Sequence, residues 1–239
     1  EKNFSWDRIA QSYKNVFITS GQRKKRIVIA TPLFPPDIGG PATYSQLLLD
    51  ELPRFGIQPR VVTFGDVRTL PKGIRHARYF LRLFRYAYNA DSIYALDPVS
   101  VGLPSSLAAF LLRKPFILKV VGDYAWEQYQ QKIQNNNTGF KSIDNFQNET
   151  VDFFTQIRRR IEHVVARRAD MVIVPSEFLK SILLQWGVDG EKIKVIYNSF
   201  ELPPLVLSRE ETRDSLRLNG TIFISAGRHV VWKGFDALI

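Results

Sequence analysis

The sequence of 239 residues has no cysteine and only three histidines. Without cysteine there are no disulfides and no thiolate metal sites, and the scattered histidines show no metal-ligand spacing. No apolar run approaches the roughly 18 residues that would cross a bilayer, and no signal-peptide pattern opens the chain. These absences favour a cytoplasmic protein without a metal site.

Negative charge is also scarce, because 23 acidic residues stand against 33 basic ones and leave a net charge of +10. Such a balance favours anionic partners, which include nucleotide phosphates, nucleic acid and the acidic face of a membrane. The pattern G-x-G-x-x-G is absent, which argues against an NAD-binding Rossmann domain. Apolar residues make up 45% of the chain, so a large core can be buried.

Apolar segments typical of buried strands alternate with helical patterns along most of the chain. This alternation predicts an α/β fold with a parallel sheet covered by helices on both faces. The expected strands are residues 27–31, 60–64, 92–96, 116–121, 171–175 and 193–197. The expected helices are residues 4–17, 43–52, 72–88, 107–112, 151–168 and 177–186, the last capped by Ser176.

Three segments interrupt the alternation. Residues 128–149 are polar and rich in asparagine, which predicts a long mobile loop of functional interest. Residues 201–219 read as an interdomain linker with a short helix, and a strand at 221–226 would then start a second domain. Residues 235–239 read as the first turn of another helix, so we expect this chain to be a fragment.

The first candidate site is the loop of residues 32–44, between the first strand and the helix that follows it. Open α/β sheets bind ligands at this carboxyl edge. Gly39 and Gly40 let backbone N–H groups approach an anion, and Pro41 suits the start of a helix whose N-terminus attracts negative charge. One interpretation is a phosphate site, and the other is a turn that only starts the helix.

The second candidate site lies in residues 225–239. Arg228 offers a forked donor and Lys233 a point charge, and together they suit a diphosphate. The alternative is two solvated cations in a loop.

The third candidate site follows the strand at 116–121. It delivers Asp123, Tyr124, Trp126 and Glu127 to the same sheet edge, where carboxylates can bind sugar hydroxyls and aromatic rings can stack on sugars. The alternative is that Asp123 caps the next helix and Trp126 belongs to the core.

The helix at 72–88 is basic and amphipathic. Arg75, Arg78, Arg82 and Arg85 recur at steps of three and four residues beside an apolar face. Such a helix can lie on an anionic membrane, at about 1 kcal/mol for each basic residue near the surface. The alternative is an ordinary surface helix.

Several motifs in this order resemble the bacterial family 4 retaining glycosyltransferases. They are PPDIGGPATYSQLLLDEL, KVVGDYAWE, VPSEFLKSILLQWGV, KVIYNSFE and GRHVVWKGFDALI, and the resemblance covers residues 24–239. It implies a GT-B fold, with two Rossmann-like domains that bind the acceptor and a nucleotide-diphosphate sugar, and it implies no metal or other cofactor. Gly39 and Gly40 match the family's glycine loop near the donor phosphates, and Arg228 and Lys233 match its diphosphate-binding pair.

This sequence departs from the family pattern at three points. Many members have a His-Asp pair after the fourth strand, whereas here Gly122 precedes Asp123, and the resemblance makes Asp123 the candidate catalytic residue without the histidine. The family's downstream acidic motif, which binds the donor, is missing. Residues 4–17 resemble the last helix of the same family, so either a second transferase ended upstream in a fusion or the chain is permuted, and we prefer the fusion.

The resemblance therefore divides the chain into residues 1–20 from an upstream transferase, an acceptor-binding domain at 24–200, a linker at 201–219 and the start of a donor-binding domain at 220–239. The expected activity is retaining sugar transfer to a sugar or lipid-linked acceptor for cell envelope polysaccharide, with the fragment itself inactive. A peripheral position on the inner membrane face is also expected. The alternatives are a nucleotide-sugar epimerase and a non-catalytic basic module that binds membrane or nucleic acid, although no nucleic-acid motif is present.

Overall fold

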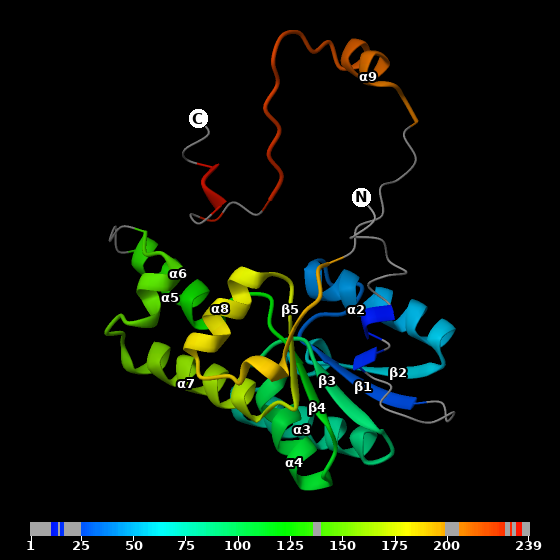
Figure 1. The fold of residues 1–239 in the computed structure, drawn as a ribbon, viewed down its shortest axis with the longest axis vertical. Coiled ribbons are helices and arrows are strands. Elements are labelled where there is room, and N and C mark those ends of the chain that lie inside the picture. The colour runs from blue at the N-terminus through cyan, green and yellow to red at the C-terminus, as the bar shows by residue number, and fades with distance from the viewer. Residues whose placement is uncertain are drawn as a thin grey trace.

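Six parallel strands form one sheet in the order β2-β1-β3-β4-β5-β6 (Figure 1). The structure is a computed structural model that describes residues 11–13, 15–16, 25–135, 140–198, 206–227, 230 and 233–235. The strands are β1 (Lys25–Thr31), β2 (Ile57–Thr63), β3 (Ser92–Ala95), β4 (Phe116–Lys119), β5 (Met171–Val174) and β6 (Ile193–Val195). The sheet grows from β1 in both directions, so its topological switch point lies between β1 and β3.

Helices cover both faces of this sheet. The helices of the sheet domain are α2 (Gly40–Glu51), α3 (Lys72–Tyr88), α4 (Gly102–Leu112), α5 (Tyr124–Asn135), α6 (Ile143–Gln147), α7 (Phe153–Arg168) and α8 (Glu177–Gln185), and α9 (Arg209–Ser215) lies away from the sheet (Figure 1). Short 3-10 turns occupy Leu52–Phe55, Gly65–Val67 and Gly190–Lys192. The Rossmann-like amino-terminal half of a GT-B fold that the sequence predicts is confirmed.

The strands alternate their side chains between two apolar clusters. On β1, Val28 and Ala30 join the cluster under α3, α4, α7 and α8, whereas Ile27 and Ile29 join the cluster under α2. Both sets are buried, because a sheet with helices on both faces exposes neither side of its inner strands. This double burial explains why the strands are nearly continuous apolar runs in the sequence.

The predicted elements of the domain are confirmed, with shifts of a few residues at their ends. Helix α3 has the bounds expected for it, and α2 begins three residues earlier than expected, at Gly40. Ser176 caps α8, since its hydroxyl oxygen accepts from the Leu179 backbone N–H at 3.2 Å.

The helix expected at residues 4–17 is described in part. Residues 11–13 and 15–16 are helical, and Tyr13 is fully buried in the cluster under α2. Trp6, Ile9 and Phe17 lie outside the described residues. The domain therefore buries at least one aromatic residue of this segment.

The expectation of a long loop at 128–149 is wrong for the residues that the structure describes. Helix α5 continues to Asn135, and α6 follows at Ile143. Glutamine, lysine and glutamate are good helix formers, so a polar segment can be helical without an obvious apolar stripe. Buried Ala125, Gln130 and Phe146 fix this polar region to the domain.

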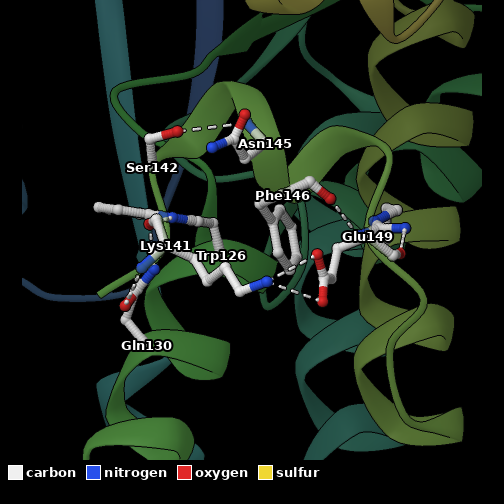
Figure 2. Close-up of polar contacts among 8 residues, drawn as sticks. Trp126, Gln130, Lys141, Ser142, Asn145, Phe146 and Glu149 are labelled. Carbon is white, nitrogen blue, oxygen red and sulfur yellow. Dashed lines mark hydrogen bonds and ion pairs between the residues drawn. The ribbon is translucent and has the colours of Figure 1, made fainter. Parts of the chain in front are cut away.

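A network of hydrogen bonds joins α5, α6 and α7 (Figure 2). The Trp126 indole N–H donates to the Lys141 carbonyl at 2.9 Å, and the Gln130 amide donates to the same oxygen. The Lys141 ammonium pairs with Glu149 at 3.1 Å. Arg159 of α7, 8% exposed, donates to the Phe146 carbonyl at 2.6 Å and the Glu149 carbonyl at 3.1 Å. These contacts give the segment defined tertiary structure.

The strand expected at 221–226 is not formed. These residues are exposed and have no regular structure, and Figure 1 shows them away from the sheet. A strand exists only when it pairs, and among the described residues nothing pairs with this segment. The short helix expected in the linker is present as α9, where Ser208 and Glu211 form a capping box.

Candidate active site at the carboxyl edge of the sheet

The glycine loop ends at the N-terminus of α2. Gly39 has φ 153° and ψ 162°, a conformation almost confined to glycine. Its carbonyl accepts from the backbone N–H groups of Ala42 and Thr43 at 3.0 and 3.1 Å, and no side chain caps the helix. Pro41 has no N–H and the next two N–H groups bond to Gly39, so Gly40 supplies the backbone N–H that can face an anion at this positive end of the helix dipole.

The two glycines have different roles in the geometry. A Cβ on Gly39 would lie 3.2 Å from Leu33 Cδ1, in addition to the backbone strain, whereas a Cβ on Gly40 would meet nothing within 4 Å. Gly39 is therefore needed by the fold, and Gly40 keeps open space in front of the helix.

A cavity of about 560 Å³ opens beside this loop. Its walls come from the segments that follow β1, β3 and β4, at the switch point where open α/β sheets bind ligands. The polar side chains that line it belong to Asp97, Ser100, Tyr124 and Glu127. The structure thus brings Gly39 and Gly40 together with Tyr124 and Glu127.

Asp97 is a wall residue that sequence reasoning missed. Its carboxylate accepts from the backbone N–H groups of Val99 and Ser100 at 2.6 and 2.8 Å, and it contacts the Ser100 hydroxyl. Burial raises the pKa of Asp97, and the bonds from Ser100 and Val99 act in the opposite direction. Its only sequence signal was its position directly after a buried strand, the position that also selected Asp123.

Asp123 is 2% exposed and is held by contacts within the fold. One oxygen accepts from the Trp126 backbone N–H at 2.7 Å, and the other accepts from the Gln147 amide at 2.9 Å. Glu162, which is fully buried, accepts from the backbone N–H groups of Tyr124 and Ala125 at 2.8 and 3.1 Å. Two carboxylates therefore cap the first turn of α5, and Asp123 does not line the cavity.

Burial raises the pKa of Asp123, and burial together with the charge of Asp123 holds the pKa of Glu162 well above its usual range. These directions follow from desolvation of the two carboxylates. The helix-capping alternative is thus observed for Asp123, while its catalytic role stays a prediction.

Two of the other expected site residues, Trp126 and Lys233, do not line this cavity. Trp126 does not line the cavity, because its indole points to Lys141 and packs edge-on against Phe140, with ring centroids 6.3 Å apart. Arg228 lies outside the described residues. Lys233 is exposed, and no contact joins it to the glycine loop among the residues described.

A second cavity of about 420 Å³ shares Gly40, Pro41, Leu96 and Val121 with the first. Lys119, 2% exposed at the end of β4, lines it. The ammonium donates to the Tyr13 hydroxyl at 3.1 Å and to the Asn198 side-chain carbonyl at 3.0 Å.

The Lys119 ammonium also lies 3.5 Å from the centre of the Tyr44 ring. Burial lowers the pKa of Lys119 to about 7. The sequence does carry a signal for this residue, a single cation inside an otherwise apolar strand, and our sequence reasoning did not use it.

A metal centre has no candidate here, since the described residues contain no group of three or more His, Cys, Asp or Glu able to hold an ion. Among the described helices, none is long and apolar enough to cross a membrane.

A model of Glycosyltransferase Family 4 matches residues 38–202, more than two thirds of the chain. The chain belongs to Glycosyltransferase Family 4. The matched residues include Gly39, Gly40 and the lining of both cavities except Pro32 and Leu33, and they end before Arg228 and Lys233. The family resemblance noted in the sequence motifs is confirmed.

A solved structure supports the fold of this family 4 chain. Anabaena Alr3699/HepE in complex with UDP and glucose is similar at 19% identity and a TM-score of 0.57, over 90% of this chain and 56% of that one. A UDP-GlcNAc 2-epimerase of Methanocaldococcus jannaschii in complex with UDP-GlcNAc and UDP matches at 13% identity and a TM-score of 0.45, over 72% and 46%. The chain spans about half the length of these proteins. A search of curated proteins found no match.

Proposed function

We propose that this chain carries the acceptor-side half of a glycosyltransferase that moves a sugar from a nucleotide-diphosphate donor to an acceptor with retained anomeric configuration. One observation carries the proposal. The uncapped N-terminus of α2, preceded by Gly39, opens onto a 560 Å³ cavity at the switch point of a family 4 domain.

In this proposal Gly40 and the helix N-terminus receive the diphosphate, and Arg228 and Lys233 neutralise its charge as it leaves. The bond between the anomeric carbon and the diphosphate oxygen breaks, the acceptor oxygen bonds to that carbon, and the acceptor proton passes to the leaving diphosphate. Stabilising charge that develops on the leaving group is electrostatic catalysis. No metal is assigned to the step.

Tyr124 and Glu127 would bind the acceptor, and Asp97 joins them because all three line the same cavity. A carboxylate accepts hydrogen bonds from sugar hydroxyls, and a half-exposed tyrosine ring can pack against a sugar face. The acceptor is proposed to be a sugar or lipid-linked sugar of the cell envelope. The complex of Anabaena Alr3699/HepE with UDP and glucose makes UDP-sugars the first donors to test.

The test uses a pair of glycine variants in the full-length protein. In Gly40→Ala the new methyl group enters the cavity without touching the protein, and Gly73→Ala in α3 adds the same group where nothing lies within 4 Å. Release of UDP from UDP-glucose and other UDP-sugars, and binding of UDP, are measured for both variants. We expect Gly40→Ala to weaken donor use about tenfold or more at unchanged Tm, because roughly 1.4 kcal/mol of phosphate contact is lost.

Gly73→Ala should behave as the unmodified protein. If Gly40→Ala and Gly73→Ala use and bind the donor equally well, the phosphate does not lie at this helix end and the proposal is wrong. Failure of the unmodified protein to bind any nucleotide sugar would also reject it.

A further inference from the structure

Three neighbouring helices expose apolar side chains on their outer surfaces. Helix α4 contacts both α3 and α7, and Figure 1 shows the three together on one side of the sheet. Their exposed apolar residues are Ile74, Leu81 and Tyr88 of α3, Leu103, Leu107, Phe110 and Leu111 of α4, and Phe153, Phe154, Ile157 and Val164 of α7. We call these residues the apolar face. Phe110 is 76% exposed and Leu111 55%.

The charges on these helices are of one sign. Helices α3 and α4 contain no acidic residue, and the only one in α7, Glu162, is fully buried. Arginines stand among the apolar residues instead, with Arg78 and Arg85 exposed on α3 and Arg160 and Arg168 exposed on α7. The three helices therefore present an apolar surface with positive charge and no exposed carboxylate.

A cavity of about 750 Å³ lies at the C-terminal end of α4 and the adjoining starts of β4 and β5. Phe110 and Leu111 line it together with the basic side chains of Arg113, Lys114 and Arg168. Asp170 also lines it, and its carboxylate accepts from the Phe116 backbone N–H at 2.7 Å. The cavity thus combines apolar groups with three cations and one carboxylate that the fold already uses.

Arg113 has an unusual backbone for its residue type. It ends α4 with φ 52° and ψ 45°, the left-handed conformation that glycine normally supplies at this position. An arginine there is less stable than a glycine, and Arg113 is one of the three basic residues that line the cavity.

We propose that the apolar face docks on an anionic bilayer, with Phe110 and Leu111 entering the interface and Arg113, Lys114 and Arg168 binding lipid phosphates. Charge complementarity selects this occupant, since surfaces that combine apolar groups with basic residues bind anionic lipid. A second copy of this chain is tested as an alternative below. The apolar side expected for α3 packs into the core, where Tyr79, Leu83 and Ala87 are fully buried, so the surface proposed here uses other residues of this helix. The proposal does not depend on sugar transfer.

The experiment is flotation with phosphatidylcholine vesicles, with and without about a third of phosphatidylglycerol. Two variants probe the surface, Phe110→Ser/Leu111→Ser and Arg113→Gly/Lys114→Gln. The glycine suits the left-handed backbone, so the second variant should fold as well as the unmodified protein. The matched controls are Phe178→Ser, an exposed aromatic of α8, and Arg54→Gln/Lys194→Gln, which removes two exposed charges elsewhere.

The unmodified protein should float with the anionic vesicles and not with the neutral ones. Each basic residue near the surface contributes about fivefold to binding, so Arg113→Gly/Lys114→Gln should weaken it roughly twentyfold. Phe110→Ser/Leu111→Ser should weaken it at high salt as well, and the controls should bind normally.

Equal binding to both kinds of vesicle, or loss of binding in the controls to the same extent, would overturn the proposal. So would absence of binding by the unmodified protein. A dimer that Phe110→Ser/Leu111→Ser converts to a monomer, with no flotation, would assign the face to a second copy of the chain instead. Sugar transfer is not needed for any of these readouts, so failure here leaves the proposed transferase activity standing.

Discussion

Lys119→Met tests the buried ammonium that joins β4 to Tyr13 and Asn198. Methionine has nearly the same length and removes the charge, together with the hydrogen bonds at 3.1 and 3.0 Å. The lost bonds destabilise the fold, and the lost desolvation cost stabilises it, so the change at a single pH does not isolate either effect. The pH dependence of stability isolates the cost of desolvating the charge, because only the charge titrates.

The sign follows from the pKa of Lys119, which is about 7 in the folded protein against 10.5 for a solvated lysine. Below pH 7 the amine is protonated in both states, so folding bears the full cost of desolvating the charge. Between pH 7 and 10.5 the folded protein has lost the proton and the unfolded chain still binds it. Stability therefore rises with pH in this window, by about 1.4 kcal/mol for each pH unit and about 3 kcal/mol from pH 7 to 9.

The measurement is urea unfolding at pH 6, 7, 8 and 9, followed by tryptophan fluorescence. Between pH 7 and 9 the free energy of unfolding of the unmodified protein should rise about 3 kcal/mol more than that of Lys119→Met. Between pH 6 and 7 the difference between the two proteins should change little. Lys194→Met, an exposed lysine of β6, is the control and should follow the unmodified protein. A difference between the unmodified protein and Lys119→Met that does not change from pH 7 to 9 would refute the argument, since Lys119 would then titrate as a solvated lysine.

Three other changes give distinct expectations. Gly39→Ala should lower stability by about 1–3 kcal/mol in thermal unfolding, because alanine avoids its backbone conformation, while Gly40→Ala should leave Tm unchanged. Arg228→Ala and Lys233→Ala in the full-length enzyme should each lower kcat/KM about a hundredfold, and a loss below about threefold in both would mean that the diphosphate binds elsewhere. Gln147→Ala removes the amide bonded to Asp123 and to the Trp186 indole at 2.9 Å each, so urea unfolding should show a loss of about 1–3 kcal/mol, and an unchanged midpoint would contradict this role.

The sequence by itself determined the order and type of the elements in the sheet domain. Strands buried on both faces are mostly apolar, so β1, β4 and β5 were recognisable without knowledge of their partners, despite the single lysine at the end of β4. The glycine loop was also predictable, because the Gly-Gly-Pro sequence has few uses other than a tight turn into a helix. Local chemistry was sufficient in these cases because each feature depends on residues close in sequence.

The tertiary structure decided how the polar residues are used. Asp123 and Asp97 both follow buried strands, yet only Asp97 lines the cavity, because Gln147 and the first turn of α5 occupy the carboxylate of Asp123. Burial in the folded domain lowers the pKa of Lys119, and the partners of its ammonium, Tyr13 and Asn198, come from segments far away in the chain.

The difference between local composition and distant contacts also explains the two errors in the predicted secondary structure. Residues 128–149 have a composition typical of loops, but α5 packs against α7, Gln130 is buried in contact with Lys141, and Phe146 is buried in contact with Arg159 of α7, so the described parts of the segment form helices. Residues 221–226 have a composition typical of a strand, but no neighbour pairs with them among the described residues. A residue's type sets which contacts it can make, whereas partners far away in the chain decide which of them form, and only the folded arrangement specifies those partners.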